Sequence, residues 1–374
     1  MPQGISLRRF FLYNEEKEAS TKRWKMGANN NRMTELDVAK GMTMFLVIFG
    51  HVYMMDTRLF NWIFMFHMPA FFFFSGMTFK PEKYIDQKNG IGRFLKDKFK
   101  KRILPYLAIT AMGFLICMIR PAYRIPVLNA GWSYMLKWIF YYAQPRELYI
   151  GQAWFLVGLF FAEVIAFLWF YLLRKRSAGI KASGLFAISW IAMLMPQINA
   201  MIPEWGRLPL KIDVAFCAAV FLIAGYFSVK WNIWERFKGA EWFMVPFCLG
   251  LSYYYGPRWH GYTNICDCVY SPGPYYYLVA LLGTAAIFFM ARLCKRCRFW
   301  QYCGTYSLHI FAVHIFIIWI IAEIINKVTG VSLTPLFIPD KFISFGISII
   351  TLLISVIMIL PWHYYKTRKK KDHV

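Results

Sequence analysis

The chain has 374 residues, of which 59% are hydrophobic and 17% are charged. An average soluble protein is about half apolar and about a quarter charged. The apolar residues come in repeated blocks of about 15 to 22, which is the length that crosses a bilayer. This pattern excludes an ordinary soluble domain and predicts one polytopic membrane domain.

The formal net charge of +24 comes from 43 lysine and arginine residues against 19 acidic residues. Such an excess is also typical of nucleic-acid-binding proteins. Here the cations lie between the apolar blocks, as at residues 174–176 and 369–371. Cations that flank apolar segments act as topology signals in membrane proteins. We therefore expect no nucleic-acid partner.

The eight cysteines are scattered, and several lie inside apolar blocks, where a thiol behaves as a small apolar group. Cys294, Cys297, Cys303 and His309 are the group closest to a metal-ligand set, but their spacing is irregular for zinc. We therefore expect no disulfide framework, no bound metal and no bound cofactor.

A window of about 19 residues gives ten candidate membrane spans. In chain order they lie at residues 38–55, 60–79, 103–119, 152–173, 184–202, 210–229, 241–255, 275–293, 305–325 and 341–361. The span at 241–255 is the weakest because it is short. Trp132 to Tyr142 is interrupted by Lys137 and is predicted to form an interfacial helix. The predicted fold is all-α, a polytopic membrane helix bundle with about ten transmembrane helices.

The distribution of positive charge predicts the orientation of these spans. Alternate connections, together with the two chain ends, carry 32 lysine and arginine residues, the other connections carry 8, and three lie within spans. Because cytoplasmic segments carry the excess, we expect both termini and the 80–102 connection in the cytoplasm, beneath a plasma (inner) membrane. The chain then divides into a cytoplasmic tail at 1–35, a transmembrane domain at 36–362 and a basic cytoplasmic tail at 363–374.

The first span holds the densest set of ionisable groups, Asp37, Lys40 and His51. A charge in the hydrocarbon region costs at least about 2.5 kcal/mol, so each is a functional candidate. Lys40 and His51 are eleven residues apart, close to three helical turns, and so share one face about 16 Å apart. We expect them to line one cavity. In the alternative, Lys40 snorkels to the headgroups and His51 meets water in the outer leaflet.

The second span contains His67 two residues before Pro69. A proline within a helix frees a backbone carbonyl, which is tolerated at membrane depth where it faces protein or water. His67 is therefore expected either to hydrogen-bond the freed backbone or to line the cavity.

Motifs in five parts of the chain follow one another in a recognisable order. They are Asp37-x-x-Lys40-Gly41 with Phe49-Gly50-His51, Phe66-His67-Met68-Pro69 with Ser75-Gly76, Lys101-Arg102-Ile103-Leu104-Pro105-Tyr106, Trp154-Phe155-Leu156, and Tyr306-Ser307-Leu308 with His314. In this order they resemble the acyltransferase-3 family of integral membrane O-acyltransferases, particularly its fucose-4-O-acetylase-like branch. The resemblance covers about residues 33–325. It departs from the family where Lys40 replaces an arginine, and where the family's Arg-x-x-Arg is represented only by Lys98, Lys101 and Arg102.

The resemblance implies transfer of an acetyl or other short acyl group from acyl-CoA, with acetyl-CoA as the usual co-substrate. The implied acceptor is a hydroxyl of a cell-surface or secreted glycan or of its lipid-linked precursor. It also implies that His51 is the catalytic base. This agrees with the ordinary pKa of histidine, which suits proton removal at neutral pH. Lys40 and Asp37 complete the expected catalytic group, since Asp37 lies one turn from Lys40 and could pair with it.

We expect the substrate- or donor-binding residues to be Lys98, Lys101, Arg102, His67, Trp154 and His314. The three cations lie where a phosphate-bearing donor would arrive from the cytoplasm, although topology alone also places cations there. Trp154 and His314 rest on the motif match, and helix packing explains them equally well. Glu163 shares a helical face with Gln152, and whether that face lines the cavity stays open. The remaining expected partners are membrane lipids.

Two other function classes remain open at this point. A membrane transporter or flippase for a glycan or small polar solute would also have about ten spans, a helix interrupted by proline and intramembrane charges. A membrane sensor or scaffold is the second alternative. Acceptor-dependent release of free coenzyme A would favour the enzyme, and a scaffold would tolerate loss of His51.

Overall fold

The computed structural model describes residues 33–53, 57–120, 127–203, 206–256, 263–270, 273–330, 338 and 340–371, without the side chains of 147 and 362–371. The predicted N-terminal tail at 1–32 therefore lies outside the described residues, as do residues 372–374. The described part consists of helices and the loops that join them and contains no strand, only one isolated bridge between Asn264 and Val269. The all-α prediction is confirmed.

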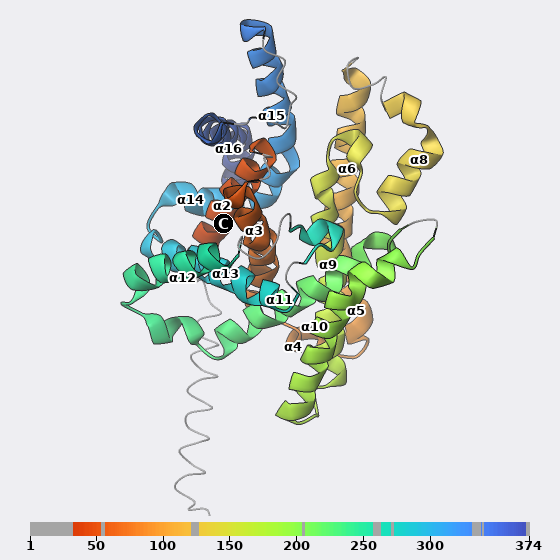
Figure 1. The fold of residues 1–374 in the computed structure, drawn as a ribbon, viewed down its shortest axis with the longest axis vertical. Coiled ribbons are helices and arrows are strands. Elements are labelled where there is room, and N and C mark those ends of the chain that lie inside the picture. Colours follow the sequence, from red (N-terminus) through yellow and green to blue (C-terminus); the bar gives the residue numbers. More distant parts are fainter. Residues whose placement is uncertain are drawn as a thin grey trace, which may run out of the picture.

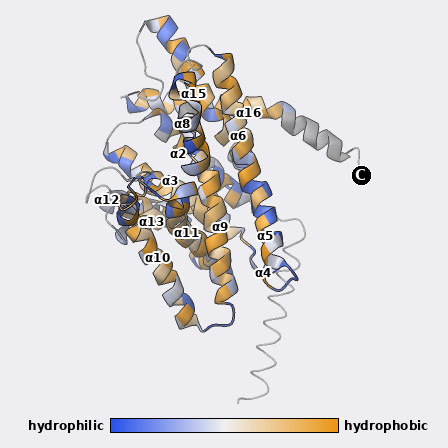
Figure 2. Ribbon diagram, turned by 90° about the vertical axis from the view of Figure 1, so that its right-hand side faces the viewer, coloured by the Kyte–Doolittle hydropathy of each residue, from blue (hydrophilic) through white to orange (hydrophobic). Residues whose placement is uncertain are grey.

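Each of the ten predicted spans overlaps a helix, and residues 54 and 55 of the first span lie outside the described residues. The helices are α2 (Thr34–Val52), α3 (Arg58–Met77), α6 (Leu104–Ile119), α9 (Trp154–Leu172), α10 (Ala178–Ala200), α11 (Ile212–Lys230), α12 (Glu241–Tyr255), α13 (Tyr275–Leu293), α15 (Ser307–Thr329) and α16 (Lys341–Lys371). Figure 2 shows the apolar colouring that runs along α6 and α9.

Shorter helices connect or extend the long ones. They are α4 (Glu82–Ile85), α5 (Gly90–Lys98), the π-helical turn η1 (Phe99–Ile103), α8 (Trp132–Leu136), the π-helical turn η2 (Lys137–Tyr141), α14 (Arg298–Thr305), and the 3₁₀ turns η3 (Arg146–Leu148), η4 (Gly151–Ala153), η5 (Pro209–Lys211), η6 (Ile233–Phe237) and η7 (Ile265–Asp267). The turn η1 joins α5 to α6, so that one continuous helix runs from residue 90 to 119.

Eight helices of the described chain are long and apolar enough to cross a membrane, and the protein is a multi-pass membrane protein. Helices α2 and α12 do not reach this standard. At 1.5 Å per residue, the 15 residues of α12 span only about 22 Å, less than the ~30 Å hydrocarbon core. Helix α2 has 19 residues but carries Glu35, Asp37 and Lys40 in its first half. Asp37 and Lys40, which make α2 a candidate for the functional site, also lower its mean hydropathy.

Helices α2 and α3 lie at the centre of the bundle, where small residues allow close packing (Figure 1). A Cβ added to Gly76 of α3 would lie 1.9 Å from the backbone oxygen of Leu222 in α11, and one added to Gly225 of α11 would lie 2.0 Å from that of Phe73. Helix α2 meets α14 in the same way, because a Cβ on Gly304 would lie 1.7 Å from the backbone oxygen of Asp37. Such contacts bring helix backbones together in membranes and leave the remaining face of α2 for the site.

The predicted interfacial helix is present as α8 followed by η2. It packs beside α6, with the rings of Trp132 and Phe114 6.0 Å apart, and it leaves Trp132 62% exposed. Its place at the membrane interface stays a prediction.

The cytoplasmic position of the 80–102 connection is tested by replacing Asn89, which lies between α4 and α5, with cysteine. In intact cells this thiol should resist a membrane-impermeant reagent and should react after permeabilisation. Ser133→Cys, on the exposed surface of α8, is the matched variant on the opposite predicted side and should react in intact cells. Labelling of Asn89→Cys in intact cells would overturn the predicted orientation.

Candidate active site

A cavity of about 370 Å³ lies beside the end of α2. We call it the histidine cavity, because two histidines contribute to its wall. It is lined by Val47, His51, Phe64, His67, Met68, Gln144, Arg146, Tyr149, Gly151, Gln152, Trp154, Asn264, Ile265, Cys266, Asp267, Phe311, Ile315 and Trp319. These residues come from α2, α3, α15, the start of α9 and two connecting loops, so only tertiary packing assembles the cavity.

His51 is in the last turn of α2, and its ring lies beside that of His314 from α15, with the ring centres 5.5 Å apart. Nδ1 of the buried His314 lies 2.9 Å from the carbonyl oxygen of Phe311 and 3.2 Å from that of Ile310. These contacts require a proton on Nδ1, which leaves Nε2 as an acceptor. Nε2 has no partner in the described part of the chain. No hydrogen bond joins the two rings in the structure, and a neutral His51 would keep one unprotonated nitrogen for the cavity.

His67 lines the histidine cavity, as one of its two expected placements requires. Its Nδ1 lies 2.8 Å from the carbonyl oxygen of Ile63, one turn earlier in α3. The carbonyl that Pro69 frees is that of Met65, because proline removes the bond to the carbonyl four residues before it. The hydrogen bond of His67 therefore does not go to the freed carbonyl.

A second cavity of about 140 Å³ adjoins the first, and we call it the basic cavity. Its lining consists of Lys40, Met44, Val47, Met68, Phe71, Ser75, Thr78, Arg102, Phe155, Leu156, Leu159, Ser307, Leu308 and Phe311. The two cavities share Val47, Met68 and Phe311, which stand at the constriction between them. Lys40 and His51 were expected to line one cavity, whereas the structure places them in two adjoining cavities that share these three apolar side chains.

The predicted cation group separates in the structure. Lys98 and Arg102 both contact the carboxylate of Glu163 in α9, with Lys98 Nζ and Arg102 Nη2 each 2.9 Å from Oε1. Lys101 instead pairs with Asp97 at 3.0 Å and is 58% exposed. Of the three cations, Arg102 reaches the lining of the basic cavity. Lys98 and Arg102 are four residues apart and so lie on one helix face, which lets them meet the same carboxylate. Arg102 lies in the π-helical turn η1, and such turns are frequent at functional sites.

The sequence analysis left open whether the helix face that carries Glu163 and Gln152 lines the cavity. In the structure, Glu163 is the anion of the cation cluster. Its side chain is 1% exposed and is held by two cations, and its Oε2 also accepts from Arg102 Nε at 3.2 Å. Gln152, at the other end of α9, lines the histidine cavity. The face of α9 that carries both residues therefore runs from one cavity to the charge cluster beside the other.

The two remaining predicted residues lie at helix starts. Trp154 begins α9, lines the histidine cavity and packs against Phe72 of α3 with ring centres 6.4 Å apart. Asp37 is buried in the first turn of α2, where Gly304 of α14 packs closely against its backbone.

The comparisons with known proteins identify the family of the chain that forms these two cavities. The model of the acyltransferase-3 family, described as an acyltransferase domain, matches residues 33–364. The chain belongs to the acyltransferase-3 family. It is therefore an acyltransferase, and this decides against the transporter and the scaffold as its class. Assignment to the fucose-4-O-acetylase-like branch stays a prediction. The comparison with solved structures found no match.

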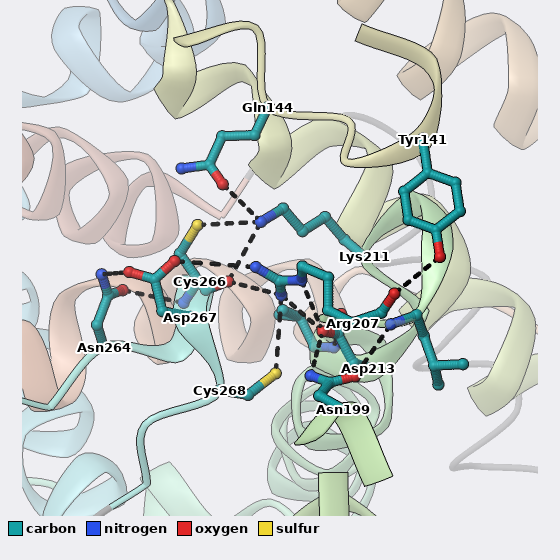
Figure 3. Close-up of polar contacts among 12 residues, drawn as sticks. Tyr141, Gln144, Asn199, Arg207, Lys211, Asp213, Asn264, Cys266, Asp267 and Cys268 are labelled. Carbon is teal, nitrogen blue, oxygen red and sulfur yellow. Dashed lines mark hydrogen bonds and ion pairs between the residues drawn. The ribbon is translucent and has the colours of Figure 1, made fainter. Parts of the chain in front are cut away.

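This acyltransferase has a buried polar network behind the histidine cavity that the sequence analysis missed (Figure 3). Arg207 donates to Asp213 Oδ2 from Nη2 at 2.6 Å and from Nε at 2.9 Å, and Asn199 Nδ2 donates to the same oxygen at 2.8 Å. Arg207 Nη2 also donates to the carbonyl oxygen of Cys266 at 3.0 Å. The network fixes the 263–270 loop, which carries part of the cavity wall, onto the start of α11.

Lys211 is the most unusual member of this network, since it is 0% exposed. Its Nζ donates to Gln144 Oε1 at 2.7 Å and to the carbonyl oxygen of Cys266 at 3.3 Å, and it lies 5.9 Å from the ring centre of Trp154. Gln144, Cys266 and Trp154 all line the histidine cavity. Leu210 and Lys211 both have positive φ, at 56° and 57°, a strain that is typical of functional sites. A lysine inside the apolar segment 210–229 was the sequence signal for this residue.

The acyltransferase also has a charged rim on the histidine cavity. Asp267 pairs with Arg146 at 3.4 Å and accepts from Asn264 Nδ2 at 2.8 Å. All three residues line the cavity, and Arg146 lies over the ring of Trp138 at 4.7 Å. No group of three or more histidine, cysteine, aspartate or glutamate residues suited to hold a metal occurs in the described part of the chain.

Proposed function

We propose that this acyltransferase moves an acetyl or other short acyl group from acyl-CoA to a hydroxyl of a glycan or lipid-linked sugar. The observation that carries the proposal is the pair of adjoining cavities along α2. Lys40 and Arg102 line one, and His51 and His67 line the other. In the proposed orientation the basic cavity is nearer the cytoplasm and the histidine cavity nearer the outside of the plasma (inner) membrane. Both termini are then cytoplasmic.

In this proposal the donor enters through the basic cavity. Coenzyme A carries phosphates, and Lys40 and Arg102 place positive charge where those phosphates would wait. A cavity of about 140 Å³ is too small for the whole coenzyme, so the thin pantetheine arm alone would reach inward. The thioester then passes the constriction of Val47, Met68 and Phe311 to reach His51.

The proposed reaction takes place in the histidine cavity. The unprotonated nitrogen of His51 takes the proton of the acceptor hydroxyl as its oxygen attacks the thioester carbonyl carbon. The carbonyl oxygen becomes negative in the tetrahedral intermediate. When the carbon–oxygen double bond re-forms, the carbon–sulfur bond breaks and the thiolate of coenzyme A leaves. The proton held by His51 is then available to neutralise that thiolate.

The acceptor is proposed to enter from the rim of the histidine cavity. Tyr149 and Trp319 present neighbouring rings there, with centres 4.4 Å apart. Aromatic faces suit the apolar faces of sugar rings. The carboxylate of Asp267 and the amide of Asn264 offer acceptors and donors for sugar hydroxyls.

The experiment that tests the proposal combines two measurements. Purified protein in detergent or lipid discs should release free coenzyme A from acetyl-CoA only when a glycan acceptor is present. Mass spectrometry of cell-surface glycans should show the loss of an acetyl-sized mass when the chain is deleted. Uptake of a solute or glycan without release of coenzyme A would contradict the proposal.

The role of Lys40 is tested by exchanging its charge and its length separately. If Lys40 contributes positive charge for the donor, Lys40→Arg should keep much of the activity. Lys40→Met, which is similar in length but neutral, should lose most of it through a raised KM for acyl-CoA. If Lys40 only snorkels, Lys40→Met should insert and work normally, because it removes an ammonium from the membrane edge. Acyl transfer at matched expression separates these two accounts.

A further inference from the structure

Two glutamine side chains belong to the wall of the histidine cavity. Gln144 and Gln152 both line it, and each is 8% exposed. Gly151, the residue before Gln152, lies close to Gln144, because a Cβ added there would lie 3.7 Å from Cγ of Gln144. Buried amides in a wall of mostly apolar side chains need hydrogen-bond partners. The hydrogen bonds that the two amides make, and the one that Gln152 lacks, indicate what each can offer to a ligand.

The orientation of Gln144 is fixed by Lys211. Oε1 of Gln144 accepts a hydrogen bond of 2.7 Å from Lys211 Nζ. An ammonium has only donors, so the amide oxygen must face it, and the NH₂ group must face away. Figure 3 shows the nitrogen of Gln144 turned away from Lys211. Gln144 can therefore offer the cavity only donors.

Lys211 also polarises this amide. It is fully buried, and no carboxylate of the described chain lies within ion-pair distance of its Nζ. Its other contacts are the carbonyl oxygen and the thiol of Cys266, at 3.3 and 3.4 Å. Burial raises the pKa of the Cys266 thiol to about 11, so that this partner is neutral at physiological pH. In its protonated form, Lys211 places a positive charge beside Gln144 and the adjoining cavity, where low polarity strengthens its effect.

Gln152 supplies the second amide. Its Nε2 is buried and has no hydrogen-bond partner in the part of the chain that the structure describes. The residue lies in η4, directly before the 19-residue helix α9. The positive end of a helix favours negative charge beside it. This donor is shielded from the cavity that the residue lines, and a half-turn of the amide would present it to a ligand atom that accepts hydrogen bonds.

We propose that Gln144 and Gln152 together donate hydrogen bonds to the thioester carbonyl oxygen as it becomes negative, with Lys211 as the positioning residue that orients and polarises Gln144. This inference rests on the proposed acyl transfer. The oxygen gains charge when the acceptor oxygen bonds to the carbonyl carbon, and it loses that charge when the carbon–sulfur bond breaks. Donors fixed in advance stabilise such an oxygen without reorganising.

The test separates donation from packing. Gln152→Met keeps the length of the side chain and removes the donor, and Gln144→Glu keeps the shape and gains an ion pair with Lys211 but offers no N–H. Each should lower kcat by about 10² to 10³, with the KM for acetyl-CoA changed little and the thermal midpoint preserved. Gln197→Met, at an exposed glutamine of α10, is the matched control and should retain activity. Lys211→Met should lower kcat in the wild-type background and cause little further loss in Gln144→Glu.

The possible outcomes distinguish this inference from the proposed function. If the wild type transfers acyl groups and Gln144→Glu and Gln152→Met keep their kcat, the amide donors are excluded and the proposed function stands. A loss that appears only in KM would also overturn the inference, because it would make the amides binding groups for the ground state. If the wild type releases no coenzyme A with any glycan acceptor, the proposed function fails and the inference fails with it.

Discussion

Replacing His51 with alanine is expected to reduce acyl transfer by about 10²- to 10⁴-fold, the range typical for loss of a general base. The residue lines the histidine cavity, and its ring neighbours the unpartnered Nε2 of His314. His51 makes no hydrogen bond to the rest of the described chain that would have to be broken. The variant should therefore insert and fold like the wild type. Coenzyme A release at matched expression measures the loss.

His309→Ala is the matched control, because it removes an imidazole of the same chain that is exposed and lies outside both cavities. It should retain activity. If His51→Ala keeps near-wild-type activity, the base must be sought at His67 or His314. Of these two, His67 lines the histidine cavity, whereas His314 is fully buried behind His51.

The helices of this protein could be predicted because each one carries its own signal. A block of apolar residues between basic connections predicts a span without reference to the rest of the chain. The exceptions have local causes as well. Helix α12 is too short to cross by itself, and α2 is made less apolar by the charges of its first half. The division of the space beside α2 into two cavities had no such signal, because Val47, Met68 and Phe311 come from three helices.

The candidate site could be predicted only where its residues lie on one helix. The spacing of Lys40 and His51 on one helix indicates a shared face, and both residues reach cavities on that face. Lys98 and Glu163 are 65 residues apart in sequence, and Gln144 and Lys211 are 67 apart. No periodicity relates such residues, so only tertiary structure shows that they meet. The sequence indicates only that a lysine or glutamate inside an apolar segment needs a partner, and it does not say which residue that partner is.

Replacing Glu163 with glutamine is expected to destabilise the protein by about 3 to 5 kcal/mol, the range for breaking a buried ion pair. The carboxylate is 1% exposed, and Lys98 and Arg102 are 13% and 25% exposed. A neutral amide would leave two cations with restricted access to water and no counter-charge. Because Arg102 lines the basic cavity, the KM for acyl-CoA should rise as well. The thermal midpoint of the purified protein and its steady-state kinetics measure the two effects.

The loss of stability in Glu163→Gln is expected to be large because the ion pair is buried, and not because a charge is removed. Glu323 of α15 also pairs with an arginine, Arg120, at 3.0 Å, but these side chains are 34% and 38% exposed. Glu323→Gln should therefore change the stability by less than about 1 kcal/mol, as for other exposed pairs. Adding Lys98→Met to Glu163→Gln should recover part of the lost stability, because it removes one of the two uncompensated cations. Equal effects of Glu163→Gln and Glu323→Gln would show that water reaches the Glu163 cluster, and its interpretation as a buried ion pair would then be wrong.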